Sequence, residues 1–155
     1  MKMQRGLLAS SLAAAAMALS LEAAADALSD CYKSAENRVQ VRQCLQRELD
    51  QTEREYEELV DRVADVMEET DRAAGGSQKP KGRGSRAESA SASFLEANRA
   101  FSAYQKRQCA FEAAALGAGT GAGNQQIACR INLMRLRMGA LESFVPLDAA
   151  ASAGK

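Results

Sequence analysis

Residues 44–70 read CLQRELDQTEREYEELVDRVADVMEET, and this stretch decides the fold of the chain. Apolar or small side chains recur in it in steps of four and three, at Leu45, Leu49, Thr52, Tyr56, Leu59, Val63 and Val66. Residues three and four apart share one side of an α-helix, so this spacing gathers all of them into a single stripe. The positions between them are mostly charged. The stretch therefore predicts one long amphipathic helix whose apolar stripe needs a partner.

Two further stretches with the same spacing follow. A second long helix is expected to begin at Ser93, because Ser93 and Glu96 match a capping box, and to stop at Gly117, a residue suited to a left-handed C-terminal cap. A third is expected from Asn124 to just before Pro146. The stripe expected on the second helix consists of Phe94, Ala97, Phe101, Tyr104, Gln108, Phe111 and Ala115. We assign Phe101 and Tyr104 of this stripe and Tyr56 of the first helix to the core.

These helices predict an all-α fold, an antiparallel three-helix bundle with a short N-terminal helical segment in residues 29–43. Residues 73–92, rich in Gly, Ser and charge, are expected to form a flexible linker inside the bundle domain of residues 26–145. Residues 146–155 are small and polar and are expected to be a disordered tail.

Residues 1–25 have the pattern of a secretory signal peptide. Lys2 and Arg5 precede an apolar run that is too short to cross a bilayer, and small residues follow up to Ala25, where we place the cleavage. The chain is therefore expected to be periplasmic or secreted, without membrane insertion once the signal is removed.

The expected export of the chain bears on the state of its four cysteines. An even number of Cys in an oxidising compartment predicts two disulfides, and sequence alone allows three pairings. If the second and third long helices form a hairpin, residues equally distant from the loop between them face each other. Cys109 and Cys129 lie at nearly the same height in such a hairpin. Cys31 and Cys44 are then the second pair.

Composition excludes several classes of function. The chain has no His, so it cannot hold a Ser-His-Asp or Cys-His site, and its cysteines lack the C-x-x-C spacing of zinc and redox sites. The glycine-rich loop at 117–123 lacks the Gly-Lys-Ser/Thr of a P-loop. A formal charge of zero argues against nucleic-acid binding. We expect no enzymatic activity, no metal and no cofactor.

The cysteine framework and several positions around it resemble the LprI-type lysozyme-inhibitor domain family, over about residues 31–141. The resemblance implies a secreted helical domain that inhibits lysozyme. Phe101 stands where the family typically has Trp. The positions that carry the resemblance are Cys31, Cys44, Tyr56, Asn98, Arg99, Ala100, Phe101, Tyr104, Cys109, Cys129, Arg137 and Leu141.

The distribution of charge points to a partner independently. Residues 45–71 contain eleven acids and three bases, whereas bases prevail in residues 73–92 and in the third long helix. Five acids share the side of the first helix away from its apolar stripe; we call them the acidic face, and they are Asp50, Glu57, Asp61, Asp65 and Glu68. The face extends over about 27 Å at about 1.5 Å per residue. It either keeps the bundle in solution or attracts a basic protein.

Two arginines at family positions, Arg99 and Arg137, are expected either to pair with the acidic helix or to contact the partner. The favoured function is inhibition of lysozyme, a basic protein, by occlusion of its substrate cleft. The alternative is an envelope interaction or structural module that binds another exported protein and does not act on lysozyme. Neither hypothesis specifies an oligomeric state.

Overall fold

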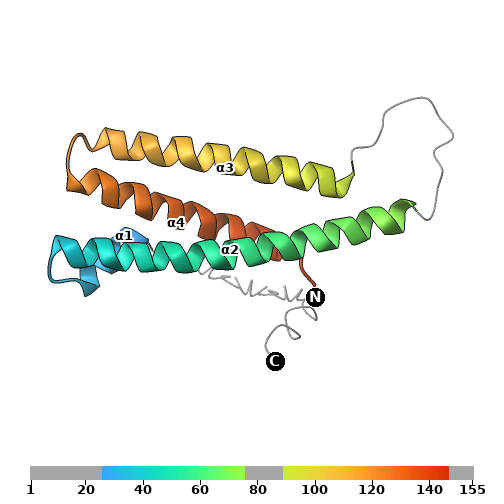
Figure 1. The fold of residues 1–155 in the computed structure, drawn as a ribbon, viewed down its shortest axis with the longest axis horizontal. Helices are drawn as coiled ribbons and strands as arrows, with labels where there is room; N and C mark the ends of the chain where they lie inside the picture. Colours follow the sequence, from blue (N-terminus) through green and yellow to red (C-terminus); the bar gives the residue numbers. More distant parts are fainter. Residues whose placement is uncertain (1–25, 76–88, 147–155) are drawn as a thin grey trace, which may run out of the picture.

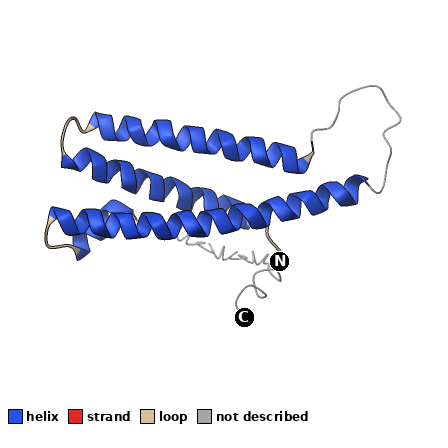
Figure 2. Cartoon of the chain, viewed as in Figure 1, coloured by secondary structure: helices blue, strands red, loops and turns tan. Residues whose placement is uncertain are grey.

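The computed structural model describes residues 26–75 and 89–146, and all regular structure in these two ranges is helical (Figure 2). A short helix, α1 (Ala27–Ser34), precedes three long ones, α2 (Arg38–Gly75), α3 (Ala90–Ala115) and α4 (Thr120–Glu142). This confirms the predicted all-α fold with its short N-terminal segment. The expected signal peptide, the middle of the expected linker at 76–88 and residues 147–155 of the expected tail lie outside the described residues.

The three long helices form an up-down-up bundle (Figure 1). α2 and α4 run in the same direction, and α3 runs antiparallel to both. α4 packs against each of the other three helices, while α1 covers one side of α2 and α4. Because α2 and α4 are parallel, their N-termini lie at the same end of the molecule.

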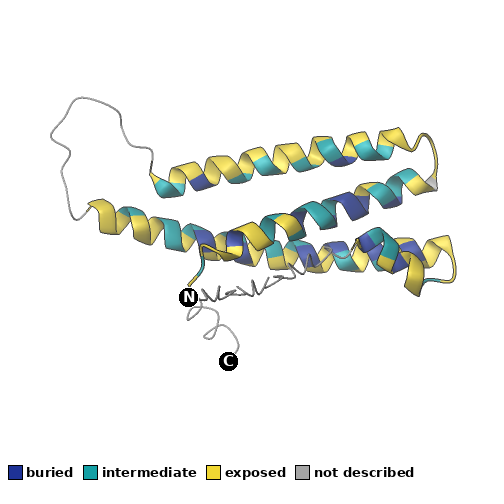
Figure 3. Cartoon of the chain, turned by 180° about the vertical axis from the view of Figure 1, so that it is seen from behind, coloured by how far each residue is buried: buried dark blue, intermediate teal, exposed yellow. Residues whose placement is uncertain are grey.

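The core lies along the apolar stripe of α2 and has two parts. Figure 3 shows buried residues on the sides where helices meet and exposed residues on the outer sides. A fully buried Leu or Ile is stabilised by about 1.5–3 kcal/mol relative to an exposed one, which is why the stripe sets the packing. One part joins α1, α2 and α4 through Ala27, Cys31, Val41, Leu45, Leu49, Ile127, Ala128, Ile131 and Met134. The other joins α2, α3 and α4 through Leu59, Val63, Phe94 and Leu141.

Both disulfides have the predicted pairing. Cys31 is bonded to Cys44 with a Cα–Cα distance of 5.7 Å, and Cys109 to Cys129 with 5.4 Å. The first joins α1 to α2, and the second joins the two arms of the α3–α4 hairpin. Gly117 in the turn of this hairpin has φ of 74°, which confirms it as the left-handed residue that ends α3.

The predicted start of α3 at Ser93 is wrong. The helix begins at Ala90, and its N-cap is Ser89, whose side chain accepts a hydrogen bond from the Ala92 amide. Asp71 of α2 also accepts bonds from the amides of Ala90 and Ser91. A carboxylate from another helix thus satisfies the first turn, so the local Ser93 capping box is not needed.

Other boundaries also differ from expectation. α2 begins at Arg38, where the Asn37 side chain accepts bonds from the Val39 and Gln40 amides, and it continues to Gly75. α4 begins at Thr120, inside the expected glycine-rich loop. α2 and α3 therefore extend into the two ends of the linker expected at residues 73–92. Packing and capping stabilise these helical turns, which helix propensity alone does not favour.

Candidate protein-binding surface

The acidic face lies on the outer side of α2. Asp50, Glu57, Asp61, Asp65 and Glu68 are all exposed. Asp61 and Asp65 each lie two residues from buried Val63, which turns them about 160° away from the core at about 100° per residue. In the described part of the chain, none of the five forms an ion pair, although Asp50 accepts a hydrogen bond from Gln46 at 2.8 Å.

Two basic residues of α4 neutralise different acids of α2. Arg135 Nη2 lies 2.6 Å from Glu48 Oε2, and Arg130 Nη2 pairs with Glu53 Oε1. Glu48 and Glu53 are half-buried and flank the apolar stripe, so these pairs lie where α4 meets α2. The ion pairs between helices consequently leave the acidic face uncompensated.

The two candidate arginines occupy different environments. Arg99 is exposed on α3. Arg137 instead points inward, with its guanidinium carbon 5.8 Å from the centre of the Phe101 ring, and its Nε is buried without a hydrogen-bond partner. No carboxylate within the described residues pairs with Arg137. Its placement favours a role inside the molecule, but as a cation over an aromatic ring and not as a member of an ion pair.

Tyr56 completes the cluster around Arg137. Its ring centre lies 5.8 Å from that of Phe101, and its hydroxyl donates a 2.5 Å hydrogen bond to Asn98 Oδ1. Burial raises the pKa of Tyr56, while the charge of Arg137 and its hydrogen bond lower it in part. Tyr56 comes from α2, Asn98 and Phe101 from α3, and Arg137 from α4, so the cluster joins the three long helices.

The assignment of Tyr104 to the core is wrong. Tyr104 is 52% exposed and Phe111, also in the expected stripe, is 67% exposed. Phe111 follows buried Cys109 by two residues and therefore points about 160° away from it. Alternating steps of three and four average fewer residues than one helical turn, so the residues of such a stripe shift gradually around the helix axis. Only the side of α3 that contains Phe94, Phe101 and Cys109 contacts the neighbouring helices. α3 thus carries two exposed aromatic side chains.

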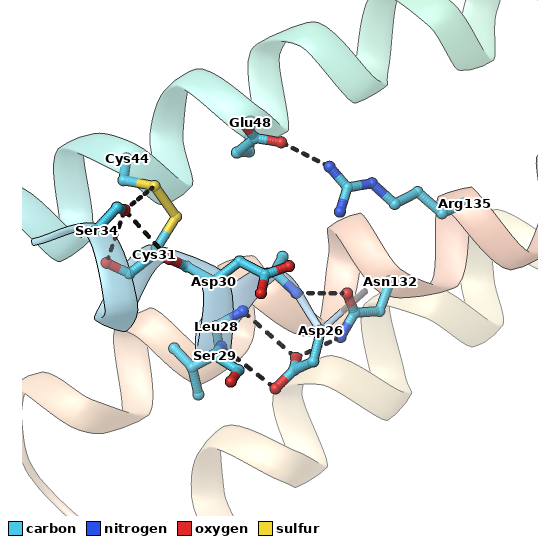
Figure 4. The surroundings of a disulfide bond; sticks show 11 residues. Asp26, Leu28, Ser29, Asp30, Cys31, Ser34, Cys44, Glu48, Asn132 and Arg135 are labelled. Atoms are coloured by element: carbon cyan, nitrogen blue, oxygen red, sulfur yellow. Dashed lines mark hydrogen bonds and ion pairs between the residues drawn. A yellow bond between two sulfur atoms is a disulfide. The ribbon is translucent and has the colours of Figure 1, made fainter. Parts of the chain in front are cut away.

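The surroundings of the Cys31–Cys44 disulfide hold α1 in place (Figure 4). Asp26 caps α1 by accepting bonds from the Leu28 and Ser29 amides, and it also accepts a 2.9 Å bond from Asn132 of α4. A cavity of about 480 Å³ beside the disulfide is lined by Ala27, Asp30, Cys31, Ser34, Cys44, Glu48 and Arg135. Glu48 and Arg135 pair with each other at this cavity, and Asp30 pairs with Lys33, so each charge in its lining has a partner.

Sequence reasoning missed the pairing of Arg130 and Arg135 with Glu53 and Glu48, since no local signal connects residues more than 70 positions apart. Among residues 26–75 and 89–146, no three potential His, Cys, Asp or Glu ligands come together as a metal site would require. No helix in the same ranges has the length and apolar character to span a membrane.

The fold and this surface define a class: a small helical domain, held by two disulfides, with an acidic face free on its longest helix. The chain belongs to the family of the lysozyme inhibitor LprI, whose model matches residues 29–141. This confirms the resemblance and covers both disulfides. The chain has no match among curated proteins and none among solved structures.

Proposed function

We propose that this protein is an exported inhibitor that binds a lysozyme and occludes its substrate cleft. Membership in the LprI family suggests lysozyme inhibition. The observation that carries the proposal for this chain is the acidic face of α2, five exposed carboxylates that no base of α4 compensates. Such a face attracts a basic protein and raises the rate at which the two meet.

The proposed mechanism needs no catalytic group. A rigid helix that lies across the entrance of a polysaccharide-binding cleft excludes the substrate by its volume alone. The two disulfides keep α1 and the α3–α4 hairpin fixed relative to their neighbours, so little order is lost on binding. They also support a location outside the cytoplasm, since disulfides persist in oxidising compartments.

A lysis assay tests the proposal directly. The purified protein is mixed with a chicken-type lysozyme, and clearing of a cell-wall suspension is followed at low and at moderate salt. We expect inhibition at stoichiometric amounts that weakens as salt screens the acidic face. Undiminished lysis at an excess of the protein contradicts the proposal for this lysozyme class and favours the alternative of an envelope interaction module.

Charge reversal localises the contact. Changing Glu57, Asp61 and Asp65 to Lys reverses the centre of the acidic face, and we expect the association rate to fall roughly tenfold or more at low salt. The control changes Glu36, Glu96 and Glu142, also exposed, to Lys and so alters the net charge equally. Equal losses in both variants contradict a local role of the face and leave only an effect of net charge.

A further inference from the structure

The two disulfides differ in how far they are exposed to solvent. All four cysteines lie in the described residues, and three of them are buried. Cys31 and Cys109 are each 1% exposed, and Cys129 is 3% exposed. Cys44 is the exception, because it is only half-buried near the start of α2. The Cys31–Cys44 disulfide is therefore the more accessible of the two.

A cavity adjoins the sulfur of Cys44. The cavity of about 480 Å³ beside this disulfide is lined by Cys44 and by Ser34 of α1, among others. The Ser34 hydroxyl lies 4.0 Å from Cys44 Sγ at an exposed contact, and Figure 4 shows the two side chains next to each other. The cavity is large enough for a small thiol, since one water molecule occupies about 30 Å³ in the liquid. A thiol in solution thus reaches Cys44 Sγ without unfolding of the bundle.

The Cys109–Cys129 disulfide lacks such an approach. Cys109 borders a smaller cavity of about 300 Å³, but Cys129 does not line it, and both residues are buried. The bond also lies between α3 and α4, two long helices that pack against each other. Its reduction therefore requires that the α3–α4 hairpin separate.

α1 is the element that the accessible disulfide holds. It has 8 residues, and an isolated helix of this length is unstable in water. Besides the disulfide, it is held by hydrogen bonds of Asp26 and Ala27 with Asn132 of α4 and by apolar contacts with the core. Cleavage of the disulfide leaves α1 to these contacts alone, so the redox state of one bond controls how firmly α1 covers the core.

We propose that Cys44 is a site of thiol–disulfide exchange in the folded protein. A thiolate attacks Cys44 Sγ and forms a mixed disulfide, while Cys31 Sγ leaves as a thiolate and takes up a proton. When the attacking molecule is a dithiol, its second thiolate attacks its own sulfur in the mixed disulfide, and Cys44 leaves and takes up a proton. The protein disulfide gains the two electrons that the dithiol loses. The chain is the target of this exchange, since it lacks the C-x-x-C spacing of proteins that perform it.

Timed reduction of the full, folded chain with dithiothreitol at neutral pH tests the site. Samples are quenched with excess N-ethylmaleimide, and the labelled cysteines are mapped by mass spectrometry. We expect Cys31 and Cys44 to be labelled together, about tenfold faster or more than Cys109 and Cys129, because exchange depends on access to the attacked sulfur. The rate should rise in proportion to the dithiothreitol concentration, as direct attack requires.

Two results of this experiment overturn the proposal. One is an equal rate of reduction for both disulfides. The other is a rate that does not depend on the dithiothreitol concentration, since opening of the fold then limits the reaction.

A monothiol identifies the sulfur that is attacked. The chain is incubated with glutathione, free thiols are blocked with N-ethylmaleimide, and peptides are mapped without reduction. We expect glutathione on Cys44 and the blocking group on Cys31. The reverse arrangement overturns the assignment of the attack to Cys44.

A serine-to-leucine variant tests the cavity as the route of approach. S34L places a large apolar side chain beside Cys44 Sγ and should slow reduction by dithiothreitol by about fivefold or more. The control S102L places the same side chain at an exposed serine of α3 and should leave the rate within about twofold. Undiminished reduction of S34L, or an equal decrease in both variants, contradicts approach through the cavity. Retention of the Cys109–Cys129 disulfide in both variants shows that they are folded.

Discussion

At the scale of single residues, the contact of Tyr56 with Asn98, Phe101 and Arg137 is the polar centre of the bundle. Each long helix contributes at least one member, so rotation of any helix about its axis breaks a contact. The Phe101 ring receives the Arg137 cation. These four positions, which are among those that carry the family resemblance, serve the packing of helices, whereas Arg99 and Tyr104 are exposed.

Because of Tyr56, the stability of the folded protein should decrease at alkaline pH. Its pKa is raised in the folded protein, chiefly by burial, so above the usual value of 10.0 the unfolded chain loses this proton more readily. The stabilisation is complete below pH 10 and is lost as pH rises through the raised pKa. Y56F should remove this dependence and cost about 1 kcal/mol at pH 7, because Asn98 loses its donor.

Urea unfolding of both proteins at several pH values between neutral and alkaline measures the difference. Y104F is the matched control, because Tyr104 is exposed and forms no hydrogen bond to another helix within the described residues. If Y104F flattens the alkaline profile as much as Y56F does, burial of Tyr56 is not the cause.

At the scale of helices, α3 depends on α2 for its start. Asp71 accepts hydrogen bonds from the Ala90 and Ser91 amides and from the Ser91 hydroxyl at 2.7, 3.0 and 2.6 Å. This contact joins the two helices across residues 76–88. The first turn of α3 consists of Ala and Ser, which are held in a helix by this contact and by the Ser89 cap.

Loss of the Asp71 carboxylate should therefore loosen the first turn of α3. The hydroxyl of Ser91, followed by its amide, lowers the pKa of Asp71. Its stabilising effect is present above the usual pKa of 3.8 and is lost as pH falls through the lowered value. In D71A we expect faster hydrogen exchange at the amides of Ser93 and Phe94 at neutral pH and a weaker dependence of stability on acid pH. D65A, an exposed acid on the same helix, should leave both measurements unchanged.

At the scale of the whole molecule, the two ends of the bundle are held differently. The half that contains α1 and the α3–α4 turn carries both disulfides, whereas the other half is held by Leu59, Val63, Phe94 and Leu141 and by the Asp71 cap. The acidic face extends along α2 through both halves. A formal charge of zero thus conceals a separation of charge between elements.

Removal of the Cys109–Cys129 disulfide should lower the stability of the whole fold, whereas removal of the Cys31–Cys44 disulfide should mainly loosen α1. Changing Cys109 and Cys129 to Ser opens a loop of sequence separation 20 and should lower the free energy of unfolding by about 3 kcal/mol. Changing Cys31 and Cys44 to Ser should chiefly raise hydrogen exchange in α1, which Asp26 and Asn132 still hold to α4. Urea unfolding measures the stability of both variants, and hydrogen exchange measures the opening of α1 in each. Equal exchange rates of the α1 amides in the two variants would contradict the prediction.

The sequence alone determined the helical fold, the pairing of the cysteines and the outward position of the acidic face. Each of these follows from periodicity along one helix or from distance to a nearby turn, and both are local properties. Tyr104 escaped prediction because a small rotation of α3 decides which side of its stripe is covered. Likewise, Ser89 and Asp71 cap α3 in place of the local Ser93 signal.

Only the tertiary structure decided where the arginines lie. It turned Arg137 inward, set Arg130 and Arg135 against Glu53 and Glu48, and brought Arg42 to the first turn of α4. These contacts join residues more than 35 positions apart through long side chains. The parallel direction of α2 and α4 determines them, and no spacing within a single helix encodes which residue of the neighbouring helix a side chain meets.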